Sequence, residues 1–223
     1  MKQNLPLLII VVVLVLAFGG GVLLYRTIRP TSATPTTDAN AKTPPPLPGA
    51  DPPRMRGGAN AAVTIEEFGD FECPPCGLLH PELVKIEREY GDRVRLVFRE
   101  YPLAQMHKSA YDAARAAEAA GMQNKFWEMH DLLYEKKDEW SLSPDPRAMF
   151  VEYAKVIGMD GDRFSRDMLG ELATTRVTLD MQRGKSMGVL GTPTLFINGK
   201  LINANDVTPD GLRLAINVAL NKK

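Results

Sequence analysis

The chain contains two cysteines, and both lie in a Cys-Pro-Pro-Cys motif at residues 73–76, between an expected strand and an expected helix. Residues 63–68 are rich in β-branched side chains, as strands are. Residues 77–90 place apolar side chains at helical spacing and end before a glycine. Because the chain has only two cysteines, it cannot be a multi-disulfide scaffold or hold a four-cysteine zinc site. The motif therefore predicts a strand–turn–helix unit with two thiols in its turn.

That position favours redox chemistry. At a helix N-terminus, the unpaired backbone N–H groups and the helix dipole favour a thiolate, which lowers the pKa of a cysteine there and makes it a nucleophile. With two residues between them, Cys73 and Cys76 can close into a disulfide within the first turn. Pro74 and Pro75 suit this turn because the missing proline N–H costs little at the start of a helix.

Two other interpretations of the cysteine pair stay open. A purely structural disulfide would close a loop of four residues and so constrain the unfolded chain weakly. A metal half-site would need partners from His80, His107 or His130, and no second ligand pair at a familiar spacing is present.

The remaining pattern predicts an α/β domain over residues 59–223. A second strand is expected at 94–98. Further helices are expected at 108–120, 124–137, 146–157 and 163–185, and they are followed by a strand at 194–197, a hairpin through Asn198-Gly199 to residues 200–202, and a helix at 209–220. The order predicts a sheet domain with a helical insertion, at about residues 104–188, between its second and third strands.

The N-terminal 58 residues differ in composition from the rest. Residues 5–25 carry no charged side chain, and 21 residues at helical rise cover roughly 30 Å, the thickness of a bilayer core. We therefore expect residues 1–29 to be a transmembrane anchor, with a cleaved signal peptide as the alternative because the small residues Ala17 and Gly19 could precede a cleavage site. Residues 30–58 hold eight of the chain's 17 prolines and are expected to be an extended Pro/Thr-rich linker.

The charge balance argues against nucleic-acid binding. The whole chain has 27 basic and 27 acidic side chains, whereas nucleic-acid binders usually carry a basic surplus. The expected single-pass topology leaves four residues before the span, too few for a domain, so the globular part should lie outside the cytoplasm.

These features together resemble DsbA-type thiol–disulfide oxidoreductases of the thioredoxin superfamily. The resemblance rests on the motif at 71–76, a following helix interrupted by Pro81, the inserted helices, and Gly191-Thr192-Pro193-Thr194, and it covers roughly residues 60–221. It implies a thioredoxin fold in which Cys73 reacts with substrate disulfides and Cys76 resolves the mixed disulfide. It also implies that Thr192 presents its backbone to a bound peptide.

The same resemblance predicts a cis Thr192–Pro193 bond facing the cysteines. Cis is cheap only before proline, and Pro193 directly precedes a strand whose first residue tolerates a missing N–H. The resemblance also implies a buried acid at Glu67 that exchanges a proton with Cys76, with a solvent-facing strand residue or a local ion-pair partner as the alternatives.

One departure from the family concerns oxidising power. The best-known strong oxidants of this family have a histidine between the cysteines, whereas here Pro74 and Pro75 lie there and Glu72 adds a negative charge. We therefore expect a less stabilised thiolate and a reduction potential nearer roughly −270 mV than −120 mV.

The sequence thus predicts a membrane-tethered, extracytoplasmic enzyme that exchanges disulfides with cysteine-containing exported proteins. It needs no cofactor or metal, because the dithiol is the redox centre, and a membrane or extracytoplasmic redox partner would recycle it. Residues 5–25 would contact the lipid bilayer. The alternatives are a non-catalytic peptide-binding or chaperone-like module and a metal-handling protein of the same fold.

Overall fold

The computed structural model describes residues 45–221, which form a five-stranded sheet flanked by helices. The strand order is β1-β3-β2-β4-β5, so β2 lies at the centre. β2 and β3 are parallel, and the other neighbouring pairs are antiparallel. The strands are β1 (Arg54–Gly57), β2 (Val63–Gly69), β3 (Val94–Glu100), β4 (Thr194–Ile197) and β5 (Lys200–Leu201).

The two long strands are buried on both faces, as parallel strands joined by a helix usually are. Helix α2 (Pro74–Tyr90) makes this connection, and the short 3-10 turn Gly91–Arg93 leads from it into β3. Apolar side chains of α2 and of α9 (Pro209–Leu220) pack into one cluster with Val63 and Ile65 of β2. That cluster fixes the α2 axis, and with it the start of the helix where the cysteines lie.

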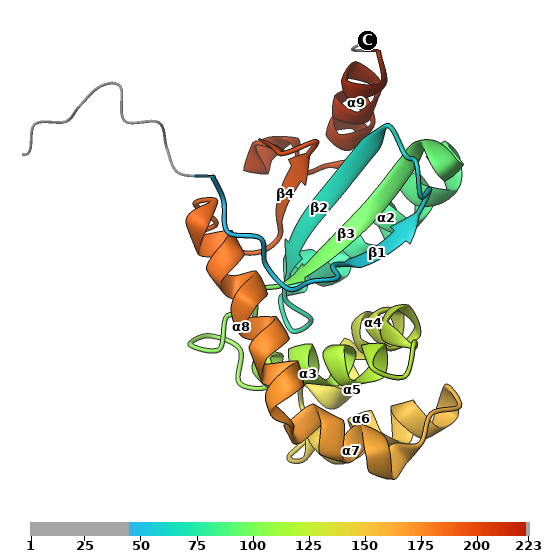
Figure 1. Cartoon of the computed structure of the whole chain (residues 1–223), viewed down its shortest axis with the longest axis vertical. Helices are drawn as coiled ribbons and strands as arrows, with labels where there is room; N and C mark the ends of the chain where they lie inside the picture. Colours follow the sequence, from blue (N-terminus) through green and yellow to red (C-terminus); the bar gives the residue numbers. More distant parts are fainter. Residues whose placement is uncertain (1–44, 222–223) are drawn as a thin grey trace, which may run out of the picture. The chain divides into compact units, whose positions relative to one another are not determined.

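A block of helices lies between β3 and β4. It comprises α3 (Ala110–Gly121), α4 (Phe126–Glu135), α5 (Lys137–Trp140), α6 (Pro146–Val156), α7 (Gly161–Leu169) and α8 (Glu171–Ser186). In Figure 1, α3 to α7 lie below the sheet, and the orange helix α8 leads from them up towards β4. A second apolar cluster fills this block and includes both cysteines, so the motif lies where the block meets the sheet.

Strand β1 corrects the expected linker. Residues 54–57 pair with β3 instead of belonging to an extended spacer, and the described fold already begins at residue 45. The sequence Arg-Met-Arg-Gly has a single apolar side chain and no β-branched residue, so it lacks the pattern of a strand. Because β1 precedes β2, the helical insertion lies between the third and fourth strands of the described sheet.

Two helix boundaries also differ from expectation. The range 163–185 is not one helix, because Gly170 leaves the helical conformation (φ −76°, ψ 163°) and separates α7 from α8. Helix α2 begins at Pro74 instead of residue 77, since proline is well suited to the first helical position.

The expected membrane span at residues 5–25 and the expected linker up to residue 44 lie outside the described residues. Within residues 45–221, each helix is too short or too polar to cross a bilayer.

Candidate active site

Cys73 occupies the N-cap position of α2, with Pro74 and Pro75 as its first two helical residues. Because neither proline has an N–H group, the backbone N–H of Cys76 is the first donor that the helix offers to the Cys73 sulfur. The Cys73 carbonyl accepts the first helical hydrogen bond, from Gly77 N–H, at 3.1 Å. In this first turn, the Cys76 N–H is thus the backbone donor that acts on the Cys73 sulfur.

The two thiols have opposite properties. A hydrogen bond with the Cys76 thiol lowers the pKa of Cys73 to about 6; burial opposes this shift, while the Thr192 hydroxyl and the Cys76 N–H add to it. Burial and the neighbouring Cys73 sulfur raise the pKa of Cys76 well above its ordinary value. A Cys73 pKa of about 6 is closer to the value of thioredoxin, about 7, than to that of DsbA, about 3.5. Both cysteines are reduced in this structure.

The loop before β4 lies against Cys73, as predicted. The Thr192–Pro193 bond is cis, and the Cys73 thiol lies 3.4 Å from the Thr192 carbonyl oxygen. A pocket of about 480 Å³ adjoins this contact and is lined by both Pro75 of the motif and Pro193 of the loop. Exposed Leu78 and buried Leu79 of α2 contribute apolar surface to it.

Glu67 is buried beneath the motif. It lies in the central strand β2, its residue is 2% exposed, and its Oε1 atom has no hydrogen-bond partner among the described residues. Burial raises the pKa of Glu67 to about 8; Arg56 opposes the shift, while Glu87 and Cys73 add to it. Glu67 is therefore the buried acid that was expected, and the alternative of a solvent-facing strand residue is wrong. Glu67 can hold or release a proton near neutral pH.

Aromatic side chains surround the base of the site. The Phe71 ring, two residues before Cys73, stacks on Phe98 of β3 at 5.2 Å and lies 4.9 Å from Tyr134 of α4. Burial raises the pKa of Tyr134 well above its ordinary value, and Cys76 and Glu67 add to the effect. These rings keep the environment of Cys76 and Glu67 apolar, and this low polarity is the cause of both raised pKa values.

The histidines do not form a metal site with the cysteines. Within residues 45–221, the group with metal-ligand spacing is His80, His130 and Asp131, and it includes neither Cys73 nor Cys76. The Arg56 guanidinium bonds the Asp131 carboxylate at 2.9 Å, so a cationic side chain already neutralises that acid. Burial lowers the pKa of His130 to about 4, which keeps its imidazole neutral as a packing residue.

Two residues near the motif were not predicted to take part in the site. Asp70 lies three residues before Cys73 and accepts the Cys73 N–H at its backbone oxygen. His107, named above only as a possible metal partner, lies 2.7 Å from the Asp70 carboxylate. An Asp followed two residues later by an N–H that it can bind is a known turn signal, so Asp70 was detectable in the sequence, whereas its contact with His107 was not.

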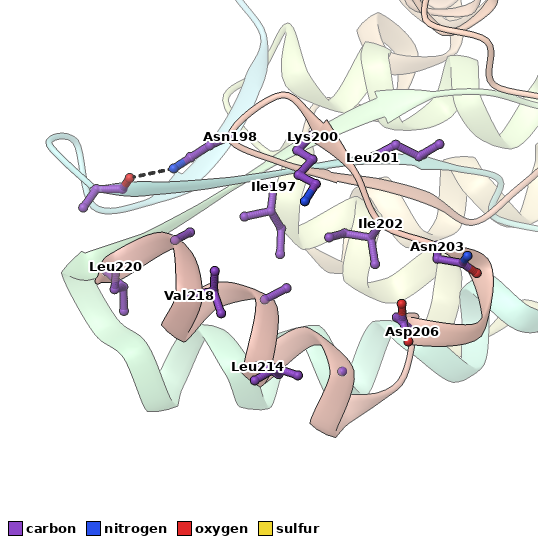
Figure 2. A pocket seen from close by; sticks show the side chains of 14 residues that line it. Ile197, Asn198, Lys200, Leu201, Ile202, Asn203, Asp206, Leu214, Val218 and Leu220 are labelled. Carbon is purple, nitrogen blue, oxygen red and sulfur yellow. Dashed lines mark hydrogen bonds between the residues drawn. The ribbon is translucent and has the colours of Figure 1, made fainter. Parts of the chain in front are cut away.

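A larger hollow, of about 730 Å³, lies away from the cysteines. It opens between β5 and α9 and is lined by apolar side chains such as Leu201, Leu214 and Val218 (Figure 2). Asn198 lies at its edge, where its side-chain amide donates to the Ala62 carbonyl at 3.1 Å, shown as the dashed line in Figure 2. No residue of the Cys-Pro-Pro-Cys motif lines this hollow.

Comparisons with known proteins agree with this geometry. A family model described as Thioredoxin matches residues 50–218. A thioredoxin-like oxidoreductase from Silicibacter pomeroyi DSS-3 is 28% identical, with a TM-score of 0.65 over 78% of this chain and 95% of that one. BdbD from Bacillus subtilis is 24% identical, with a TM-score of 0.68 over 78% of this chain and 96% of that one, and this likeness shows a shared fold.

A third similarity covers only part of a much longer protein. The Na(+)/H(+) antiporter NhaA 3 of Salinispora tropica is 41% identical over 152 residues, which are 67% of this chain and 22% of the antiporter. The chain thus matches about a fifth of the length of that curated relative.

Proposed function

Since this chain belongs to the thioredoxin family, we propose that it is a thiol–disulfide oxidoreductase acting on cysteine-containing exported proteins through Cys73 and Cys76. The observation that carries the proposal is the asymmetry of the two thiols. The pKa of Cys73 is lowered to about 6, whereas burial raises that of Cys76 well above its ordinary value. Disulfide exchange needs this asymmetry, because one sulfur must attack as a thiolate while the other stays protonated until its turn.

In the reducing direction, the Cys73 thiolate attacks one sulfur of a substrate disulfide. The substrate S–S bond breaks, a substrate thiolate leaves and takes up a proton, and a mixed disulfide joins Cys73 to the substrate. Cys76 then loses its proton and attacks the Cys73 sulfur, which releases the second substrate sulfur. The substrate has gained two electrons and the pair has become a disulfide; oxidation of a substrate follows the same steps in reverse.

Glu67 supplies the proton acceptor for Cys76. Its carboxyl is buried, its pKa of about 8 reflects that burial, and the Cys76 pKa responds to its charge. A base whose pKa lies near the working pH is the most effective partner in proton transfer. The direct alternative, release of the Cys76 proton to bulk water, is hindered because Cys76 is fully buried.

Thr192 and Pro193 provide the binding edge for the substrate. The backbone at Thr192 lies against Cys73, and an extended peptide bound there would place its disulfide at the Cys73 sulfur. The adjoining pocket beside Pro75 and Leu78 would accept an apolar side chain of that peptide.

We further propose that residues 5–25 tether the enzyme to a membrane with its globular part outside the cytoplasm, where a redox partner recycles the pair. The uncharged span and the proline-rich segment after it support this. Fractionation of cells expressing the chain should recover it with membranes after an alkaline wash. Recovery of a soluble form that begins near residue 20 would instead identify a cleaved signal peptide.

A redox titration of the full-length protein, together with reduction or oxidation of a disulfide-containing protein substrate, tests the proposed activity. We expect reversible two-electron cycling that is lost in Cys73→Ser, with a potential nearer roughly −270 mV than −120 mV. If Cys73 and Cys76 do not undergo reversible oxidation but the protein still binds peptides, the chain is a binding module. Metal-dependent quenching of both thiols would make it a metal-handling protein.

A further inference from the structure

The turn that carries Cys73 is built on Asp70. The Asp70 side chain is fully buried, and its Oδ1 atom accepts the Glu72 N–H at 2.8 Å. Its backbone oxygen accepts the Cys73 N–H at 3.1 Å. The position of Cys73 therefore depends directly on how Asp70 is held.

The same carboxylate is held by the loop that follows β3. Asp70 Oδ2 lies 2.9 Å from the Leu103 N–H and 2.7 Å from Nδ1 of His107. An ionised carboxylate can only accept hydrogen bonds, so Nδ1 carries the hydrogen in this pair. The Leu103 carbonyl in turn accepts the N–H of His107 at 2.9 Å, which folds the loop back and brings the imidazole to the carboxylate.

A second carboxylate, that of Glu72, also holds this loop. Glu72 Oε2 accepts the Ser109 N–H at 2.7 Å, at the start of α3. The acid whose charge raises the pKa of Cys73 is Asp70, against the lowering by hydrogen bonds from Cys76 and Thr192. The negative charge that opposes thiolate formation therefore comes from Asp70, although Glu72 is nearer in sequence.

We propose that His107 is a positioning residue for the reaction of Cys73: by donating to Asp70 it holds that carboxylate in the turn and offsets its charge, so that the Cys73 thiolate forms more readily. This inference rests on the proposed function for its biological meaning. The titratable groups that face Cys73 are Cys76 of α2, Glu67 of β2 and Asp70. Those that face Asp70, besides His107, are Glu100 of β3 and Tyr134 of α4.

The pair makes opposite predictions for its two members. Asp70→Asn removes the negative charge but keeps an oxygen for the Glu72 N–H, so the Cys73 thiolate should form at lower pH. His107→Ala leaves the charge without its donor, so the thiolate should form at higher pH. Each shift should be roughly one pH unit, the low end for a change in a neighbouring charge.

Two further variants separate this effect from mere loop structure. His107→Asn places an amide N–H where Nδ1 lies, and it should restore most of the wild-type behaviour. Met106→Ala changes the adjacent residue of the same loop, whose side chain is 73% exposed, and should leave the thiolate unchanged.

The experiment is the pH titration of the Cys73 thiolate in the reduced, full-length protein. It is followed by ultraviolet thiolate absorbance and by the rate of alkylation, with Cys73→Ser as the blank. Opposite shifts in Asp70→Asn and His107→Ala, with rescue by His107→Asn, would support the proposal. Shifts of the same sign, no shift, or an equal shift in Met106→Ala would overturn it.

The titration reads the thiolate and needs no substrate, so the two proposals fail separately. If the variants show the expected shifts but the wild-type protein exchanges no disulfide, only the proposed function is overturned. If Asp70→Asn does not fold, the His107 series decides by itself, since alanine and asparagine there must differ in thiolate midpoint for the proposal to stand.

Discussion

At the scale of single residues, the two cysteines have different roles because they lie three positions apart, on either side of the start of a helix. Cys73 precedes the first helical residue and contacts the Thr192 carbonyl, whereas Cys76 lies inside the first turn and is fully buried. A helix N-terminus stabilises negative charge at its cap, and burial penalises it a turn later. The pKa of Cys73 is therefore lowered, whereas the pKa of Cys76 is raised.

This asymmetry predicts which cysteine forms the covalent intermediate. Cys76→Ser should accumulate mixed disulfides with substrate proteins, because the resolving sulfur is missing, whereas Cys73→Ser should trap none. Non-reducing electrophoresis of each variant after incubation with a disulfide-containing protein measures this. Equal trapping by both variants, or faster alkylation of Cys76 than of Cys73, would contradict the assignment.

Glu67 predicts a dependence of stability on pH. Burial raises its pKa from 4.5 to about 8, so between these values the folded protein binds a proton that the unfolded chain has released. The stabilisation is complete below the lower value and is lost as pH rises through the higher one, at up to about 1.4 kcal/mol per pH unit. Glu67→Gln should abolish this loss.

The measurement is the free energy of unfolding of the reduced wild type and of Glu67→Gln across that pH range. The variant should gain relative to the wild type as pH rises, and the difference should level off above about pH 8. Since both proteins keep their cysteines, thiol titration largely cancels. Parallel pH profiles would show that Glu67 does not titrate in the folded protein.

At the scale of secondary-structure elements, helix α8 approaches the sheet through a glycine. A Cβ atom at Gly184 would lie 2.6 Å from the Tyr101 ring and 3.0 Å from Phe68 of β2. Alanine usually stabilises a helix relative to glycine, by up to about 1 kcal/mol. Here overpacking should reverse the sign, and Gly184→Ala should cost about 1–3 kcal/mol.

Gly77 of α2 is the matched control for this prediction. A Cβ atom there would first meet Lys137 at 3.9 Å, an ordinary contact, so Gly77→Ala should be neutral or stabilising. Denaturant unfolding of both variants gives the comparison. Equal gains in stability would show that α8 does not pack closely on the sheet.

At the scale of the whole molecule, residues 45–58 belong to the fold. Arg54 of β1 forms an ion pair with buried Glu118 of α3, and the Ala50 N–H bonds the Asp180 carboxylate of α8 at 2.8 Å. The Arg99 guanidinium of β3 donates to the Ala50 carbonyl at 2.9 Å. Residues 45–58 thus connect the sheet to the helical block through hydrogen bonds and an ion pair with largely buried charged side chains.

This arrangement predicts where the chain can be shortened. A protein that begins at residue 45 should unfold at the same temperature as the full chain. One that begins at residue 59 should lose at least about 1.5–3 kcal/mol, the contribution of one hydrogen bond to a charged group, because it lacks both the Ala50 N–H bond to Asp180 and the Arg99 bond to the Ala50 carbonyl, in addition to an edge strand. Thermal unfolding of the two truncated proteins decides this, and equal stability would return the segment to the role of a linker.

The sequence by itself determined the local features of this protein. The strands predicted at 63–68 and 194–197, the helix at 209–220, and the presence of a helix after the cysteine motif were predictable, because periodic side chains and caps act over a few residues. For the same reason the reactive motif was recognisable, since its chemistry depends on a turn of four residues. The cis bond before Pro193 was likewise predicted and is confirmed.

Only the tertiary structure decided which distant residues meet. β1 is a strand because β3 offers it an edge, and four residues with one apolar side chain carry no such signal of their own. Glu67 has a pKa of about 8 because the block of helices and the rings of Phe71 and Tyr134 remove it from water. His107 reaches Asp70 across 37 residues of chain. Burial and charge act through space, so their effects are set only when the chain has folded.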